Sequence, residues 1–177
     1  GFFGGDSYVD DVGALLRDDS NGENARSVVA VVRHGAFRLL FAGDLTGGGS
    51  DTDDVEGFAV ARLGADVVGE GAGVDVLHLS HHARNTSSSA AWLDGLLPHD
   101  GRPRTAIAGI STAHVNSPHE EVVDGVLDGR LSGGAFWATA VAVGGVADDV
   151  VDAGGGSIRV RTEAGGDRVL VQAVDDI

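Results

Sequence analysis

The chain has no cysteine, no methionine and no lysine. Without cysteine there can be no disulfide bond and no metal site built on thiolates, so any metal ion must be held by histidine, aspartate or glutamate. No apolar run approaches the ~20 residues of a membrane-spanning helix. The N-terminal stretch also lacks the basic and apolar regions of a secretory signal.

Basic residues are scarce, since 12 arginines stand against 27 acidic residues and the formal net charge is −15. Such a surface should repel nucleic acid at ordinary salt, because polyanions are bound through basic patches. The acidic residues are scattered rather than clustered, which indicates a compositional cause such as a GC-rich genome or a saline habitat. The charge is therefore weak evidence about the substrate.

Residues 74–97 contain the segment with the clearest functional signal in the sequence. The apolar run Val74–Leu79 has the length and β-branched character of a buried strand. His81 and His82 follow it, then a turn rich in hydroxyl groups, and then Ala90–Leu97, which has the pattern of an amphipathic helix. A strand that brings paired imidazoles to its C-terminal end is a common way to build a reactive edge in an α/β protein.

Strands and helices alternate along the rest of the chain, which indicates a layered α/β sheet. Further strands are expected at 27–33, 36–42, 105–110, 136–143, 157–162 and 168–173, and further helices at 55–63 and 118–127. The first two strands should form one hairpin and the last two another. Ser117 is expected to cap the helix at 118–127, with Glu120 completing a capping box. No domain boundary is visible, so residues 1–177 are treated as one domain.

Polar side chains follow three of the expected strands: Asp44, the pair His81 and His82, and the turn His114–His119. Neighbouring parallel strands place their C-terminal ends on one edge of the sheet, so these side chains can meet. A carboxylate and a neutral imidazole are ligands suited to Zn²⁺ or Mn²⁺. An aspartate can also bridge two cations, which together lower the pKa of a shared water.

Each of these residues also has a purely structural interpretation. A Gly-Asp pair after a strand, as at Asp44, most often forms a turn. A single histidine at a strand end is more often a hydrogen-bonded structural residue, and the adjacent pair His81 and His82 leaves the two interpretations evenly matched. His78 lies inside the strand and is expected to pack or to face solvent.

Two expected helix starts favour an anion. His119 should lie in the first turn of its helix, where free N–H groups and the helix dipole favour a bound anion and keep the imidazole neutral. The hydroxyl groups of Thr86, Ser87 and Ser88 precede a second helix start of the same kind. Two anion-binding helix starts beside a metal edge suit a phosphate ester.

Four motifs occur in order along the chain. They are an Asn and a Ser opening a strand at 24–28, a hairpin ending in Gly-Asp-Leu at 41–45, a strand running into His-His and a Ser-rich turn at 77–87, and a helix start at 116–120 that approximates His-Pro-His-Pro-Glu. In this order the chain resembles the metallo-β-lactamase-fold hydrolases, most closely the domain attached to ComEC-type DNA-uptake competence proteins. The resemblance covers about residues 24–130, with a looser match in the C-terminal hairpin.

The resemblance implies the second half of a four-layer αββα metallo-β-lactamase sandwich. It implies that Asp44 is a catalytic, metal-bridging carboxylate and that His81 is a ligand, with His82 as the alternative. His119 would face the substrate and act in catalysis. The other implied substrate contacts are Asn24, Ser27 and Ser87, of which Asn24 and Ser27 lie where many relatives place a further metal ligand. The implied cofactor is Zn²⁺, as a two-metal site in the complete domain, with Mn²⁺ as the alternative.

The chain departs from the family at two points. Ala83-Arg84 replaces the usual Gly-Ser, which alters the turn and brings a positive charge near the site. The His-x-His-x-Asp-His signature, which supplies most of the family's metal ligands, occurs nowhere in the chain. We therefore expect a single partial domain, the C-terminal half of the fold. It would be a fragment of a longer protein, a half that pairs with the N-terminal half in trans, or a degenerate relative; the fragment is favoured, because Asp44 and His81 would have no use in an inactive protein.

The expected function is that of a metal-dependent hydrolase, in which hydroxide formed at the metal attacks a small-molecule or nucleic-acid phosphodiester. The alternative is a non-catalytic half-domain that serves in binding or assembly. We expect a soluble chain without a membrane span, cytoplasmic unless it is attached to a membrane competence protein.

Overall fold

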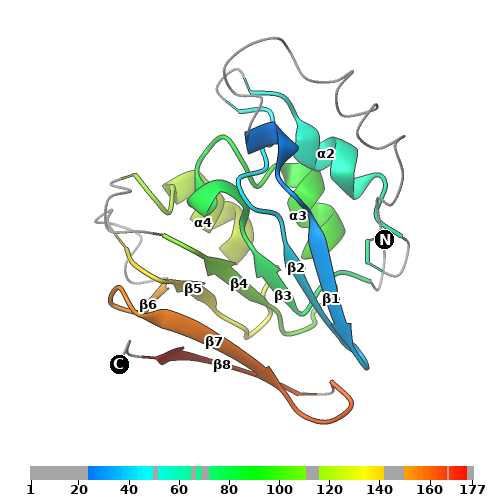
Figure 1. Ribbon diagram of the computed structural model, residues 1–177, viewed down its shortest axis with the longest axis vertical. Helices are drawn as coiled ribbons and strands as arrows, with labels where there is room; N and C mark the ends of the chain where they lie inside the picture. Colours follow the sequence, from blue (N-terminus) through cyan, green and yellow to red (C-terminus); the bar gives the residue numbers. More distant parts are fainter. Residues whose placement is uncertain are drawn as a thin grey trace.

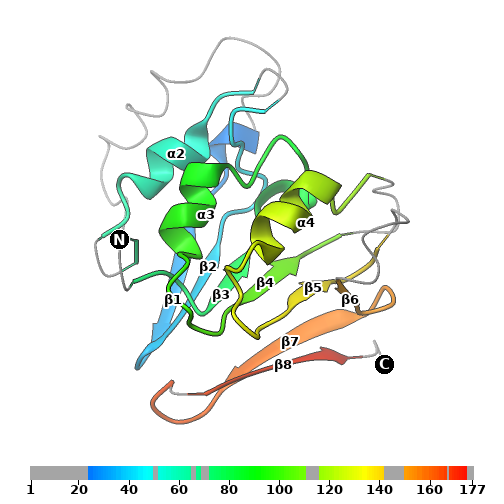
Figure 2. The ribbon, with the colours of Figure 1, turned by 180° about the vertical axis from the view of Figure 1, so that it is seen from behind.

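The structure is a computed structural model, and it describes residues 24–49, 52–64, 67–68, 72–110, 116–141, 150–166 and 168–174. These residues form a mixed α/β fold in which a six-stranded sheet carries helices on one face and a two-stranded hairpin on the other (Figure 1, Figure 2). The expected α/β class is thereby confirmed, in three layers. None of the helices in these ranges is long and apolar enough to cross a membrane.

The six-stranded sheet has the order β1-β2-β3-β4-β5-β6, and its first pair is antiparallel whereas the remaining strands run parallel. Its strands are β1 (Ala30–His34), β2 (Phe37–Phe41), β3 (Val76–His78), β4 (Thr105–Ala108), β5 (Phe136–Ala138) and β6 (Val151–Asp152). The helices are α2 (Val55–Val60), α3 (Ala90–Leu96) and α4 (Glu120–Leu127), with short turns η1 (Asn24–Arg26) and η2 (Ser80–Ala83). The separate hairpin consists of β7 (Ser157–Thr162) and β8 (Val169–Val174).

The start of α4 differs from the expected capping box. His119 is the N-cap residue, its backbone is extended with φ −81° and ψ 138°, and no side chain caps the helix. Ser117 is 1% exposed, and within the described ranges its hydroxyl has no hydrogen-bond partner. The amide of His119 donates to the carbonyl of Ala83 at 2.8 Å, which holds the chain extended up to this residue. The expectation that Ser117 caps the helix is therefore wrong.

The main core lies between the sheet and the helices. Side chains alternate between the two faces of a strand, so Leu40, Leu77 and Ala106 all point to the helical face, and each is 0% exposed. They pack against Trp92 of α3 and Val126 of α4, which are equally buried. This core fixes the position of the helices above the sheet.

A second, smaller core lies under the β7–β8 hairpin. Its buried members come from the other face of the sheet and are Phe37, Leu39, Val76 and Ile107, against which Trp137, Ile158, Val160, Val169 and Val171 pack. Strand pairing explains this grouping, because Leu39 is in register with Val76 and partners in register point to the same face. The hairpin therefore covers the middle of the sheet.

The turn of the β7–β8 hairpin is held close to the β1–β2 turn. The amide of Ala36 donates to the carbonyl of Gly165 at 3.1 Å. Gly166 has a φ of +76°, and a Cβ atom there would lie 1.9 Å from the carbonyl oxygen of His34. This close approach needs glycine both for its backbone conformation and for its lack of a side chain.

We expect Gly166→Ala to lower the free energy of unfolding by about 2 kcal/mol or more, because it adds a backbone clash to the strain of a positive φ. The matched control is Gly155→Ala, since Gly155 has a φ of +88° and open space around the added Cβ. Urea unfolding of both variants measures the effect. Equal losses would mean that the contact between the two turns contributes nothing.

The parallel strands bring the polar loop starts together. β2, β3 and β4 run in the same direction, so the segments after them lie along one edge of the sheet (Figure 1). β2 leads to Asp44, β3 leads to His81 and His82 in η2, and β4 leads to Gly109. His114, expected to belong to the same edge, lies outside the described residues.

Candidate functional site

The side chains of Asp44 and His82 meet at the C-terminal edge of the sheet. His82 Nε2 lies 3.6 Å from Asp44 Oδ1, and the two side chains are 29% and 43% exposed, respectively. The amide of Asp44 donates to the hydroxyl of Ser27 at 3.0 Å, which ties the loop after β2 to the segment before β1. A carboxylate and an imidazole from neighbouring parallel strands therefore converge in a partly open position.

The ring of His82 is held by a backbone carbonyl. Its Nδ1 lies 2.5 Å from the carbonyl oxygen of Gly109, at the end of β4. A carbonyl oxygen can only accept a hydrogen bond, so Nδ1 carries the proton. In the neutral ring Nε2 then carries the lone pair, and this is the atom directed at Asp44.

His81 is directed elsewhere. Its Nε2 lies 3.4 Å from Asn24 Nδ2 and its Nδ1 lies 3.0 Å from Thr86 Oγ1. The amide of His81 donates to the carbonyl of Gly43 at 2.9 Å, so its backbone is tied to the loop that carries Asp44. Of the two histidines left as alternatives, the one that reaches Asp44 is His82.

The turn that presents the two histidines has an uncommon backbone. His81, His82 and Ala83 have φ angles of 47°, 58° and 56°, in the left-handed region that residues other than glycine seldom adopt. Such conformations persist where the surrounding structure holds them, and they cluster at functional sites. Here the holding bonds are those from the His81 amide to Gly43 and from the His119 amide to Ala83.

His78 is a third imidazole close to this pair. Its ring centroid lies 5.6 Å from that of Phe41, and within the described part of the chain its Nδ1 has no hydrogen-bond partner. Burial lowers the pKa of His78, the charge of His82 lowers it further, and the charge of Asp44 acts in the opposite direction. Burial thus favours the neutral form of this ring, and of the two expectations, packing or facing solvent, its contact with Phe41 fits packing.

A hollow of about 330 Å³ lies beside His81. Its lining is Asn24, Thr46, Thr52, His81, Arg84, Asn85 and Thr86, which is polar throughout. Asn24 was expected here from the resemblance. Thr46 and Thr52 were not, because a threonine in a loop gives no signal in the sequence until the fold brings it to a site.

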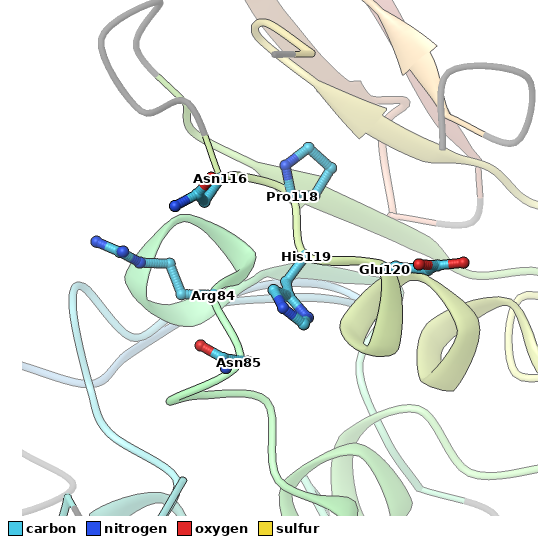
Figure 3. Close-up of a pocket in the computed structure, with 6 residues that line it drawn as sticks. All are labelled: Arg84, Asn85, Asn116, Pro118, His119 and Glu120. Carbon is cyan, nitrogen blue, oxygen red and sulfur yellow. The ribbon is translucent and has the colours of Figure 1, made fainter. Parts of the chain in front are cut away.

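A second hollow, of about 310 Å³, shares Arg84 and Asn85 with the first (Figure 3). It is lined by Arg84, Asn85, Asn116, Pro118, His119 and Glu120. The side chain of His119 is 35% exposed and its Nδ1 lies 4.0 Å from Glu121 Oε2. His119 therefore borders a hollow on the same side of the sheet as the Asp44–His82 pair, although it precedes its helix instead of lying in the first turn.

Ser87 has a structural part in this turn. Its hydroxyl donates to the carbonyls of Ser80 and Arg84, both at 2.9 Å, and the residue is 6% exposed. Its neighbour Thr86 lines the first hollow instead. The hydroxyl of Ser87 is thus engaged within the turn, and the predicted contact of this turn with an anion stays a prediction.

A buried carboxylate accepts hydrogen bonds from the loop that follows η2. Glu56 of α2 is 0% exposed and accepts hydrogen bonds from the amides of Ser88 at 2.8 Å and Ser89 at 2.7 Å. Burial raises the pKa of Glu56 to about 7, and these two amides act in the lowering direction. Glu56 thus links α2 to the loop between η2 and α3.

Within the described residues, no group of three or more His, Asp or Glu side chains is close enough to hold a metal ion. Asp44 and His82 therefore supply two donors of the type that Zn²⁺ accepts, which is fewer than a stable site needs. Comparison of the chain with protein-family models, with curated proteins and with solved structures found no significant match.

Proposed function

We propose that this chain carries part of the active site of a metal-dependent hydrolase that acts on phosphodiesters. The observation that carries the proposal is the approach of His82 Nε2 to Asp44 Oδ1 at 3.6 Å. Zinc bonds of about 2.0–2.2 Å at a tetrahedral angle place two ligand atoms about 3.3–3.6 Å apart. The separation of the two side chains therefore fits two ligands of one cation.

The surroundings of His82 support the same assignment. A metal-ligating histidine generally donates its second N–H to a carbonyl or carboxylate, which fixes the tautomer and the ring orientation. The bond from His82 Nδ1 to the Gly109 carbonyl is of this kind. The glycine-type φ of 56° at Ala83 also fits the resemblance, because the related hydrolases have glycine at this point of the turn.

A divalent cation at Asp44 and His82 would polarise an ester oxygen and acidify water, which is the chemistry that hydrolysis needs. The protein groups around the proposed cation have different roles. Ser27 holds the amide of Asp44, and the Gly109 carbonyl orients His82. Thr86 and His119 border the two hollows, where they can orient the substrate.

We further propose that the remaining ligands come from the N-terminal half of a metallo-β-lactamase fold, either in the same polypeptide or in a partner. An exposed apolar surface supports this. Val28, Val32 and Phe41 are 79%, 47% and 42% exposed. Val32 is in register with Leu39, which lies under the β7–β8 hairpin, so this surface continues the face that the hairpin covers. A second sheet packed there, with helices of its own on its outer face, would complete the four layers.

We expect the chain to bind Zn²⁺ weakly, and Asp44→Asn and His82→Ala to reduce that affinity at least tenfold, since each removes one of two donors. His81→Ala is the matched control and should change the affinity little, because its ring points to Asn24 and Thr86. Equilibrium dialysis with zinc analysis measures the affinity. Broadening of the imidazole NMR signals by Mn²⁺ identifies the binding ring even when binding is weak.

Equal zinc affinity in the wild type and in Asp44→Asn would remove Asp44 as a ligand and with it the proposed hydrolase. The competing function is a non-catalytic binding or assembly module, in which Asp44 and His82 form an ion pair. The lack of a third close donor within the described residues favours that alternative. In that case His82→Ala should lower stability and leave zinc affinity unchanged.

A further inference from the structure

Arg84 forms a wall shared by the two hollows. It lines the hollow of about 330 Å³ beside His81 and also the hollow of about 310 Å³ beside His119, and Asn85 does the same. Each hollow is at the lower end of the size of small-molecule sites. A ligand that extends from one hollow into the other would contact these shared residues.

In Figure 3 the guanidinium of Arg84, which lines the second hollow, extends away from His119. In Figure 3 the side chains of Arg84 and Asn116 extend to the same side, whereas the carboxylate of Glu120 points the opposite way. No carboxylate among the described residues pairs with the Arg84 side chain. By contrast, Arg104 and Arg130 each make an ion pair with an aspartate. Within the described residues, Arg84 therefore differs from these two arginines in having no carboxylate partner.

The chemistry of these groups selects an anion. An arginine offers parallel N–H donors that match a phosphate or carboxylate, and the amide groups of Asn85 and Asn116 can donate to the same oxygens. In a chain with a net charge of −15, an anion is held only where a local cation offsets the repulsion. The two hollows, of about 330 Å³ and 310 Å³, have room for a short ligand.

We propose that Arg84 binds a second anionic group of the substrate, next to the phosphodiester to be cleaved, so that the preferred substrate is a short phosphodiester with an additional phosphate. The inference rests on the proposed function, because the hydrolase assignment supplies the first phosphodiester. The inference goes beyond the proposed function, because it names a residue that determines substrate specificity. Serine is usual at this position in the related hydrolases.

The test compares two ligands that differ by one phosphate: a thymidine dinucleotide with a free 5′-hydroxyl and the same dinucleotide with a 5′-phosphate. Binding is measured by calorimetry or NMR titration of the full chain, with a chelator present so that no hydrolysis occurs. We expect the added phosphate to tighten binding to the wild type about tenfold, the size of one charge-assisted contact. Arg84→Ala should remove this gain, and Arg84→Lys should retain part of it.

The charge-matched control is Arg159→Ala, which removes one positive charge from the exposed face of β7. This variant should keep the full gain from the phosphate. Arg84→Ala is expected to fold, because Arg84 has an extended backbone of φ −82° and ψ 158°, and its main-chain bonds with His81 and Ser87 do not involve the side chain. A circular dichroism melt confirms folding before the titrations.

Three results would overturn the inference: equal affinity of the wild type for both dinucleotides, a gain that survives in Arg84→Ala, or no detectable binding of either dinucleotide. These outcomes are independent of the zinc experiment. Zinc binding that depends on Asp44, combined with no role for Arg84, would remove only this inference. Phosphate discrimination by Arg84 without zinc binding at Asp44 would remove the hydrolase and leave an anion site.

Discussion

Replacing Arg104 by methionine is expected to lower the free energy of unfolding by about 3–5 kcal/mol, the usual loss when one partner of a buried ion pair is removed. The Arg104 side chain is 1% exposed and forms an ion pair with Asp100. It also donates to the carbonyl of Ala72 at 2.9 Å and to that of Pro98 at 3.2 Å. Methionine would leave these acceptors without their donor.

The control for Arg104→Met is Arg102→Met. Arg102 is two residues away and also pairs with an aspartate, since its Nη2 lies 3.3 Å from Asp75 Oδ1, but its side chain is 43% exposed. An exposed pair of this kind contributes about 0–1 kcal/mol. Urea unfolding of both variants gives the two losses. Similar losses would show that burial of the guanidinium does not decide its contribution.

The contribution of the Arg104–Asp100 pair to stability also depends on pH. The hydrogen bond from Arg104 holds the pKa of Asp100 well below its usual value of 3.8. A carboxyl group whose pKa is lowered on folding adds stability above its unfolded pKa and loses it as the pH falls. The difference between the wild type and Arg104→Met should therefore be largest at neutral pH and shrink in strong acid.

The stability contributed by Glu56 is expected to fall by about 3 kcal/mol as the pH rises from 4.5 to 7. The cause is burial, which raises the pKa of Glu56 from 4.5 to about 7 in the folded state. Between these values the folded chain binds more protons than the unfolded chain, so stability decreases with rising pH. Its contribution is therefore fully present below pH 4.5 and lost as the pH passes 7.

Glu56→Gln isolates this effect. Glutamine does not titrate, so the stability of the wild type minus that of the variant should fall across the range in which Glu56 loses its proton. At pH values below this range the variant should be less stable than the wild type. The reason is that the side-chain NH₂ of glutamine would face the backbone N–H of Ser88 or Ser89, so that two donors meet. The control is Glu163→Gln, on an exposed carboxylate. A constant difference across the range would contradict a raised pKa at Glu56.

Residue pattern alone was enough for most of the secondary structure. The helix expected at Ala90–Leu97 is α3 (Ala90–Leu96), and the hairpins expected around Gly35 and Gly165 are both present. These elements have strong local signals, such as regular apolar spacing and glycine at turns. The strands came out shorter than expected, because β3 and β4 end where the chain turns toward the site.

The approach of Asp44 to the histidines was partly predictable. A residue after β2 and residues after β3 must lie near the same edge when the two strands are parallel neighbours, and the alternation of strands and helices indicated that arrangement. Which histidine turns toward Asp44 was not predictable, because the answer depends on three consecutive left-handed residues at 81–83. Local propensity disfavours that conformation in residues other than glycine, in alanine more than in histidine.

The sequence by itself determined the α/β class, the available ligand types and the polar segments that reach the edge of the sheet, because composition and hydrophobic spacing act locally along the chain. Only the tertiary structure decided that His82 faces Asp44, that the Ser87 hydroxyl bonds within its turn and that Arg84 lines two hollows. It also decided that Glu56 and Arg104 are buried. These features depend on contacts between segments far apart in sequence, and no local pattern of residues encodes such contacts.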